Sequence, residues 1–211
     1  PAVGIVYAEG QVFDGEGEDD NVYSVNVSKT LRKAREDKDI KAVVFRVNSP
    51  GGSALASDVI WREVELLRKE KPVIVSMGSY AASGGYYISA GADAIVADRL
   101  TLTGSIGVFS MVPNFEKIIK EKARINIVNI NSNEHSDLMT LTKPLDKEEI
   151  AYMQKSVENI YDSFLSIVAN GRDMTTEEVD KIAQGRVWSG TDAMKIGLTD
   201  EIGTVADALQ Y

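Results

Sequence analysis

The chain has 211 residues, with 23 Lys and Arg against 32 Asp and Glu, and its formal net charge is −9. Hydrophobic residues make up 44% and charged residues 26%, a mix typical of a soluble globular domain and not of a disordered chain. The acidic balance argues against nucleic acid as the main partner. No apolar run approaches the ~20 residues that a membrane-spanning helix needs.

The counts of cysteine and histidine remove several kinds of catalytic site. The chain has no cysteine, which excludes disulfides, thiolate metal sites and cysteine nucleophiles. Its one histidine is His135, so a multi-histidine zinc site is excluded, and a Ser-His-Asp triad would have to use this residue. We expect no metal and no cofactor.

In chain order, short apolar runs alternate with stretches of helical periodicity. The runs predict strands at 3–8, 40–47, 72–77, 93–97, near 105–109 and at 125–130. The periodic stretches predict helices at 22–37, 53–69, 80–91, 114–122, 144–170, 190–196 and 204–210, with one more helix opening at the capping box of Thr175 and Glu178. This order favours one α/β domain over residues 1–211, with a largely parallel sheet flanked by helices and a helical C-terminal region.

The first notable loop, N-S-P-G-G-S at residues 48–53, directly follows an apolar strand. It lacks the spacing of a phosphate loop. The pair Gly51 and Gly52 allows a tight turn whose bare N–H groups can hold a developing oxyanion. A plain strand-to-helix turn explains the same residues, so this loop alone does not decide between the two interpretations.

The second loop surrounds Ser83 with small residues, in the run S-Y-A-A-S-G-G-Y-Y at 79–87. Its position between an apolar strand and a helix is close to a nucleophile elbow, in which Gly84 would offer an oxyanion donor. A helix that packs tightly on the sheet through small residues is the competing interpretation. A nucleophilic serine also needs a base. The candidates are His135, in a polar loop, and a lysine of depressed pKa.

The two loops together resemble the signal peptide peptidase A family of Ser/Lys peptidases. The resemblance continues through L-T-G-S-I-G-V at 102–108, G-R-V-W-S-G at 185–190 and G-L-T-D-E-I-G at 197–203. It covers nearly the whole chain in order, and it implies a fold similar to the Clp protease and crotonase folds.

The resemblance also implies roles for individual residues. Ser83 matches the family's nucleophile, and Gly84, with Gly52 or Gly51, matches the oxyanion donors. Ser105 matches a serine that orients the catalytic lysine.

The catalytic lysine itself is missing from its family position. In the stretch H-S-D-L-M at 135–139, Ser136 stands where the lysine is expected. Longer members of the family are tandem fusions, in which the C-terminal half supplies the serine and the N-terminal half of a neighbouring subunit supplies the lysine. The chain resembles such a C-terminal half, and Lys143 or Lys147 could serve only after a rearrangement of the loop.

The resemblance implies an envelope peptidase associated with the inner membrane. It would lie outside the cytoplasm, be anchored by a segment N-terminal to Pro1, and form a homo-oligomer. Its substrates would be apolar peptides such as signal-peptide remnants. Two other classes stay open: a crotonase-like acyl-CoA enzyme, which the lack of a carboxylate beside Ser83 disfavours, and a non-catalytic scaffold half.

Overall fold

The computed structural model describes residues 2–18, 20–138 and 140–211. The chain divides into two compact units: residues 1–107 with 161–211 form the first, and residues 108–160 form the second. Among the described residues, no helix combines the length and the apolar character needed to cross a membrane.

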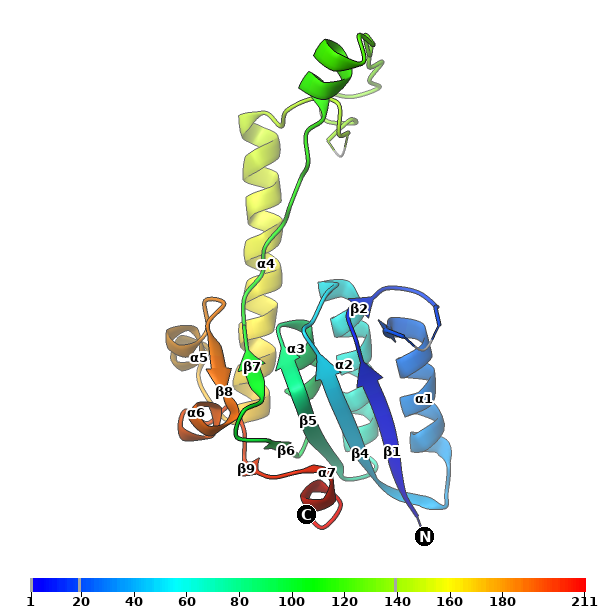
Figure 1. Cartoon of the computed structure of the whole chain (residues 1–211), viewed down its shortest axis with the longest axis vertical. Coiled ribbons are helices and arrows are strands. Elements are labelled where there is room, and N and C mark those ends of the chain that lie inside the picture. Colours follow the sequence, from blue (N-terminus) through cyan, green and yellow to red (C-terminus); the bar gives the residue numbers. More distant parts are fainter. Residues whose placement is uncertain (1, 19, 139) are drawn as a thin grey trace. The chain divides into compact units, whose positions relative to one another are not determined.

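The first unit is built on a sheet whose central strands run parallel (Figure 1). In spatial order the strands are β1 (Ala2–Glu9), β4 (Ile40–Ser49), β5 (Val73–Ala82), β6 (Ala94–Ala97) and β9 (Glu201–Ile202). The short strand β7 (Leu102–Gly104) continues the sheet beside the end of β5, and β8 (Val187–Ser189) pairs antiparallel with β7. Two residues of β2 (Val12–Phe13) pair with β3 (Val22–Tyr23) apart from this sheet. The Val- and Ile-rich runs of β4 and β5 are typical of parallel strands buried on both faces.

Three helices cover one face of the sheet (Figure 1), namely α1 (Ser24–Glu36), α2 (Ala54–Arg68) and α3 (Gly84–Ser89). Leu31 of α1 and Ile60 of α2 are fully buried in the same core as Phe45 of β4. On the opposite face, a smaller cluster joins Val44 and Ile74 to α7 (Val205–Ala208). The parallel sheet with flanking helices predicted from the sequence is therefore confirmed.

The C-terminal part of the first unit is largely helical, as predicted. It contains α5 (Thr176–Ile182), α6 (Gly190–Lys195) and the part of α4 (Lys147–Arg172) from residue 161 onward. The capping box of Thr175 and Glu178 is present.

Two predicted element boundaries in the first unit are wrong. The small-residue run after residue 79 continues β5 through Ala82, because residues 80–82 pair with β7, so no helix begins at residue 80. The strand predicted near 105–109 is instead β7, which ends at Gly104. Gly104 and Ser105, with φ of 76° and 50°, turn the chain out of the extended conformation.

The second unit contains a π-helical turn, η1 (Ile118–Lys122), and the first part of α4. The predicted helix at 114–122 is thus mostly this turn, and the long predicted helix begins at Lys147 instead of residue 144. The predicted strand at 125–130 is wrong. Its alternating apolar residues have no neighbouring strand in the described part of the chain, and without a ladder partner the segment stays irregular.

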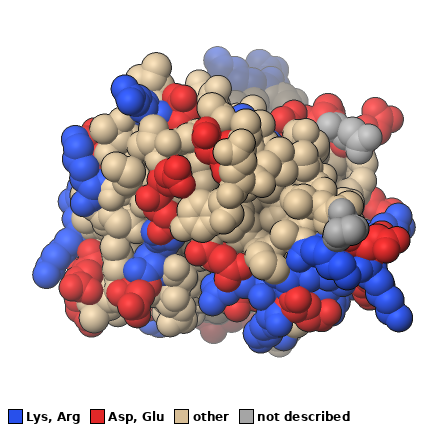
Figure 2. All heavy atoms as spheres, turned by 90° about the horizontal axis from the view of Figure 1, so that it is seen from below, with Lys and Arg blue, Asp and Glu red and all other residues tan. Residues whose placement is uncertain are grey.

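Acidic and basic side chains are interspersed over the face drawn in Figure 2. The net charge of −9 therefore does not gather into one acidic field on that face.

Candidate active site

Ser83 occupies a sharp turn between a strand and a helix. β5 ends at Ala82 and α3 begins at Gly84, and the backbone of Ser83 has φ 53° and ψ −121°. A serine with positive φ is uncommon and persists only where its surroundings hold it. Here the Ser83 N–H donates to the carbonyl of Gly104 over 2.9 Å, and the Ser83 carbonyl accepts from the N–H of Tyr87 over 2.9 Å. Ser83 is half-buried, so this turn presents it to solvent at the end of the strand.

The glycine turn of residues 51–52 lies directly against Ser83. A Cβ atom on Gly51, whose φ is +94°, would lie 2.5 Å from the amide nitrogen of Gly84 and 2.8 Å from Cβ of Ser83. A Cβ atom on Gly84 would in turn lie 3.2 Å from the amide nitrogen of Gly52. Gly51, Gly52 and Gly84, which the sequence singled out, therefore lie together beside Ser83. Their close packing leaves no room for side chains at Gly51 and Gly84.

The amides of this cluster differ in their hydrogen bonds. The N–H of Gly51 donates to Oγ of Ser49 over 3.1 Å. The carbonyl of Gly51 accepts from the N–H of Val12, and the N–H of Ser53 donates to the carbonyl of Val12. The N–H of Gly52, between them, has no acceptor among the described residues. Gly84 is the first residue of α3, so its N–H has no acceptor within the helix. Two amides beside Ser83 are thus free to bind an anionic oxygen.

Ser105 directly follows β7, whose last residue is Gly104. Its N–H donates to the carbonyl of Arg186 over 2.7 Å, which anchors it next to β8, and it is half-buried. Gly104, just before it, has φ +76°, and a Cβ atom there would lie 2.8 Å from the Trp188 ring. The carbonyl of Gly104 also accepts the N–H of Ser83, so Ser105 is next in the chain to the residue that holds the turn at Ser83.

An irregularity in β5 sets the position of Ser83 relative to the glycine turn. Val47 of β4 lies opposite Met77, whereas Ser49 lies opposite Ala81. One intervening residue of β4 therefore faces three of β5. Such bulges re-aim the side chains that follow them and are common beside active sites.

Asn48 fills this bulge, a role that the sequence analysis missed. Its Oδ1 accepts the N–H of Tyr80 over 3.2 Å, and it occupies the space of a missing Cβ on Gly78, 2.6 Å away. The carbonyl of Gly78 accepts from Oγ1 of Thr101 over 2.7 Å. The signal that could have revealed the bulge is Gly78 itself, because a glycine inside a strand pattern often marks one.

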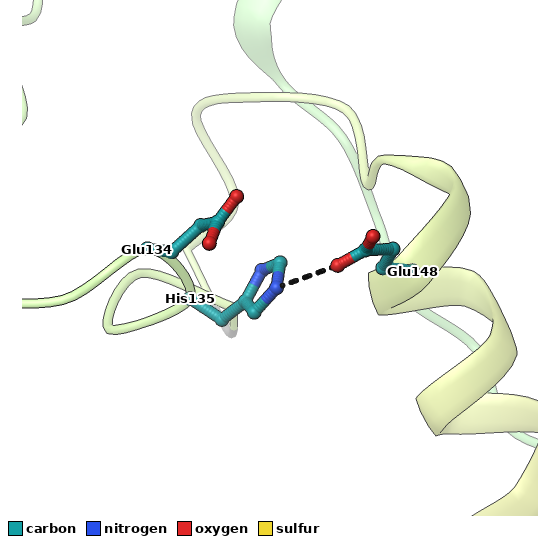
Figure 3. Close-up of side chains that lie close together, drawn as sticks. All are labelled: Glu134, His135 and Glu148. Carbon is teal, nitrogen blue, oxygen red and sulfur yellow. Dashed lines mark hydrogen bonds and ion pairs between the residues drawn. The ribbon is translucent and has the colours of Figure 1, made fainter.

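Ser136, where the family resemblance leads us to expect a lysine, lies in the second unit, on a turn that follows the irregular segment. It is exposed, and its Oγ donates to the carbonyl of Asn133 over 3.0 Å. Its neighbour His135 has Nε2 at 3.2 Å from a carboxylate oxygen of Glu148 (Figure 3) and Nδ1 at 3.9 Å from Asp146. Desolvation opposes protonation of His135, but the hydrogen bond to Glu148 and the nearby carboxylate charges outweigh it and raise the pKa of the imidazole.

Lys143 is held by two carboxylates of the second unit. Its Nζ lies 2.7 Å from Asp137 and 2.8 Å from Glu149. The hydrogen bonds to Asp137 and then to Glu149 raise the pKa of Lys143, and the hydrogen bond to Lys143 lowers the pKa of Asp137 to about 2. In this arrangement Lys143 stays protonated and does not suit the role of a neutral general base.

Two overlapping groups of side chains in the second unit have the right chemistry to hold a metal ion: Glu134, His135 and Glu148, and His135, Asp146 and Glu149 (Figure 3 shows the first). Glu149, however, is already bonded to Lys143 and to the amide of Asp146, over 2.8 Å and 2.9 Å. Ion pairs and a helix cap account for these contacts without a metal.

A strained serine beside free glycine amides, at the end of a parallel strand, defines an α/β protein with a serine-hydrolase type of site. A solved structure with a similar fold is a ClpP1 variant from Listeria monocytogenes, with a TM-score of 0.63 and 16% sequence identity over 97% of this chain and 94% of that one. The fold is therefore ClpP-like, as expected, and the sequence profile of Clp protease matches residues 2–105.

The profile of peptidase family S49 matches residues 65–211. Protease 4 of Haemophilus influenzae is 47% identical over 98% of this chain and 34% of its own length. The chloroplastic serine protease SPPA of Arabidopsis thaliana is 44% identical over 85% of this chain and 26% of its own length. The chain belongs to peptidase family S49, a family of serine peptidases. It spans about a third or less of the length of these two relatives.

Proposed function

We propose that this chain is the nucleophile-bearing domain of a serine endopeptidase that cleaves apolar peptides, such as the remnants of signal peptides. One observation carries the proposal. Ser83 is held at positive φ beside the amides of Gly52 and Gly84, and neither amide has an acceptor in the part of the chain that the structure describes. The protease names of the relatives support the same reaction class.

In the proposed reaction, Oγ of Ser83 attacks the peptide carbonyl, and its proton passes to a base and then to the leaving amine. Water subsequently hydrolyses the acyl-enzyme. The N–H groups of Gly52 and Gly84 stabilise the oxyanion. Gly51 was an alternative donor, but its N–H already donates to Ser49, so its proposed role is to shape the turn. Ser105 orients the base.

The proposed base is a lysine from an N-terminal domain of the same or a neighbouring subunit. One observation favours a base from elsewhere: Lys143 is held in ion pairs with Asp137 and Glu149. The much greater length of the relatives leaves room for such a domain.

The complete protein is proposed to be a homo-oligomer at the inner membrane, with this domain outside the cytoplasm and an anchor in another segment. Exposed apolar side chains in the second unit support an assembly, because extensive exposed apolar surface is typical of interaction sites.

The test is cleavage of apolar fluorogenic peptides by the full-length protein. Ser83→Ala should lower kcat/KM by about 10³-fold or more, because the residual catalysis of serine peptidases without their nucleophile is small. The matched control is Ser79→Ala, an exposed serine on the same strand, which should leave activity unchanged. Full activity in Ser83→Ala would refute the nucleophile assignment. An inactive wild-type protein that still assembles would favour the scaffold alternative.

A further inference from the structure

We propose that Ser49 is a positioning residue of the oxyanion site: its hydroxyl holds the Gly51 amide, so that the free amides of the turn stay directed at Ser83. The inference rests on the proposed function and assigns a role to a residue that neither touches substrate nor transfers a proton.

Ser49 is fixed in place by its surroundings. It is the last residue of β4, it lies opposite Ala81 in the sheet, and it has no exposed surface. On its other side lies the start of α3, where a Cβ atom on Gly85 would come within 2.5 Å of the Ser49 carbonyl oxygen and 3.3 Å of its Cβ. Ser49 is thus packed between β5, which precedes Ser83, and α3, which follows it.

The hydroxyl of Ser49 meets a specific need of the turn. Pro50 has no N–H, so Gly51 carries the first amide after the strand, and that amide donates to Oγ of Ser49 over 3.1 Å. A buried amide without an acceptor is unfavourable, and a glycine backbone rotates easily to find a new one. Loss of the hydroxyl would therefore let the peptide unit at Gly51 turn, and Gly52 would move with it.

The consequence for catalysis follows from the contacts of the turn. A Cβ atom on Gly84 would lie 3.2 Å from the amide nitrogen of Gly52, and a Cβ atom on Gly51 would lie 2.5 Å from the amide nitrogen of Gly84, so the two nitrogens lie in the same small region. A displacement of about 1 Å in such a group can cost roughly 10²-fold in rate. The proposed role of the Gly52 amide is to bind the oxyanion and not the side chains of the substrate, so KM should change little.

The experiment uses the full-length protein with an apolar fluorogenic peptide. Ser49→Ala should lower kcat by about 10- to 100-fold with KM within about twofold. A peptide aldehyde, whose adduct with Ser83 carries an oxyanion-like oxygen, should bind more weakly by a similar factor. An uncleaved peptide should bind a Ser83→Ala protein equally well with and without Ser49→Ala.

Three variants serve as controls. Ser89→Ala removes another fully buried hydroxyl, one that donates to the carbonyl of Gly85 over 2.7 Å, and should leave kcat unchanged. Ser49→Thr keeps the acceptor and should restore most of the rate. Ser49→Cys, which keeps the volume and a weak acceptor, should give an intermediate rate and replaces Ser49→Ala if that protein does not fold.

Equal kcat in Ser49→Ala and wild type would overturn the positioning role, as would an increase in kcat, which would mean that the released Gly51 amide serves as a donor. An equal loss in Ser89→Ala would show a general effect of buried hydroxyls and would also overturn it. A wild-type protein without Ser83-dependent cleavage would instead refute the proposed function itself, so the two failures are distinguishable.

Discussion

The two units of the chain differ in how firmly their candidate functional residues are held in place. In the first unit, Ser83 and Ser105 both have positive φ, and each is held by a main-chain hydrogen bond to a neighbouring segment. In the second unit, Phe109, Val128 and Ile130 are 85%, 82% and 95% exposed, and ion pairs link its loop residues to one another and to the start of α4. The surroundings of Ser83, the proposed nucleophile, are therefore packed within the first unit, whereas the second unit, which carries Ser136, exposes apolar surface that would suit a partner.

The largest expected effect is on the rate of hydrolysis, which depends on whether a general base is present. The isolated chain should hydrolyse an activated apolar peptide ester about 10²- to 10⁴-fold more slowly than the full-length protein, because general-base assistance is missing. Ser136→Lys should recover part of this rate, and the recovered rate should rise with pH as the new amine loses its proton.

The controls for this experiment are a lysine elsewhere in the same loop, Ser132→Lys, and the double variant Ser136→Lys with Ser83→Ala. Neither should show recovered activity. An isolated wild-type chain as active as the full-length protein would mean that a base within this chain, such as His135 or Lys143, has been overlooked.

The next effect concerns the glycine turn of the first unit. Gly51→Ala should lower kcat about 10²-fold or more per folded molecule, because its Cβ would meet Ser83 and Gly84. The matched control is Gly15→Ala, where φ is +91° and no atom lies within 4 Å. It should lose about 1–2 kcal/mol of stability from its positive φ and no activity per folded molecule. The comparison uses activity assays corrected for the folded fraction, which thermal melting measures. An equal loss of activity per folded molecule in both variants would contradict a specific role of the glycine turn.

A smaller effect tests the bulge. Asn48→Ala should lower the free energy of unfolding by about 0.5–1.5 kcal/mol, because the amide of Tyr80 loses its side-chain acceptor. Gly78→Ala should be severely destabilising alone and much less so in the Asn48→Ala background, since its Cβ would collide with the Asn48 side chain. Urea unfolding of the four proteins measures this coupling, and additive effects would show that the two residues do not interact.

The smallest effect lies in the second unit. Lys143 lowers the pKa of Asp137 to about 2, so this pair should help to fix the loop above about pH 4 and lose that contribution as the pH falls toward the folded value. In Lys143→Met the Asp137 pKa should return toward about 4. Carboxyl ¹³C NMR titration measures both values, and an unchanged midpoint in the variant would contradict the ion pair.

The sequence predicted most of the first unit because its strands and helices carry clear apolar patterns, and because Ser83 stands out among Ala and Gly. It did not reveal the roles of Asn48 and Ser49, which depend on a register shift between β4 and β5 that no local pattern encodes. The strand predicted at 125–130 is wrong, because alternating apolar residues are typical of a strand but this segment has no neighbouring strand in the described chain.

We propose that Ser83 is the nucleophile of a peptidase site whose base comes from outside this chain. Labelling of the full-length protein with a fluorophosphonate, followed by mass spectrometry of the peptides, tests it most directly. We expect label on Ser83 in the full-length protein and little label on the isolated chain. Label on a different serine, or rapid labelling of Ser83 in the isolated chain, would contradict it.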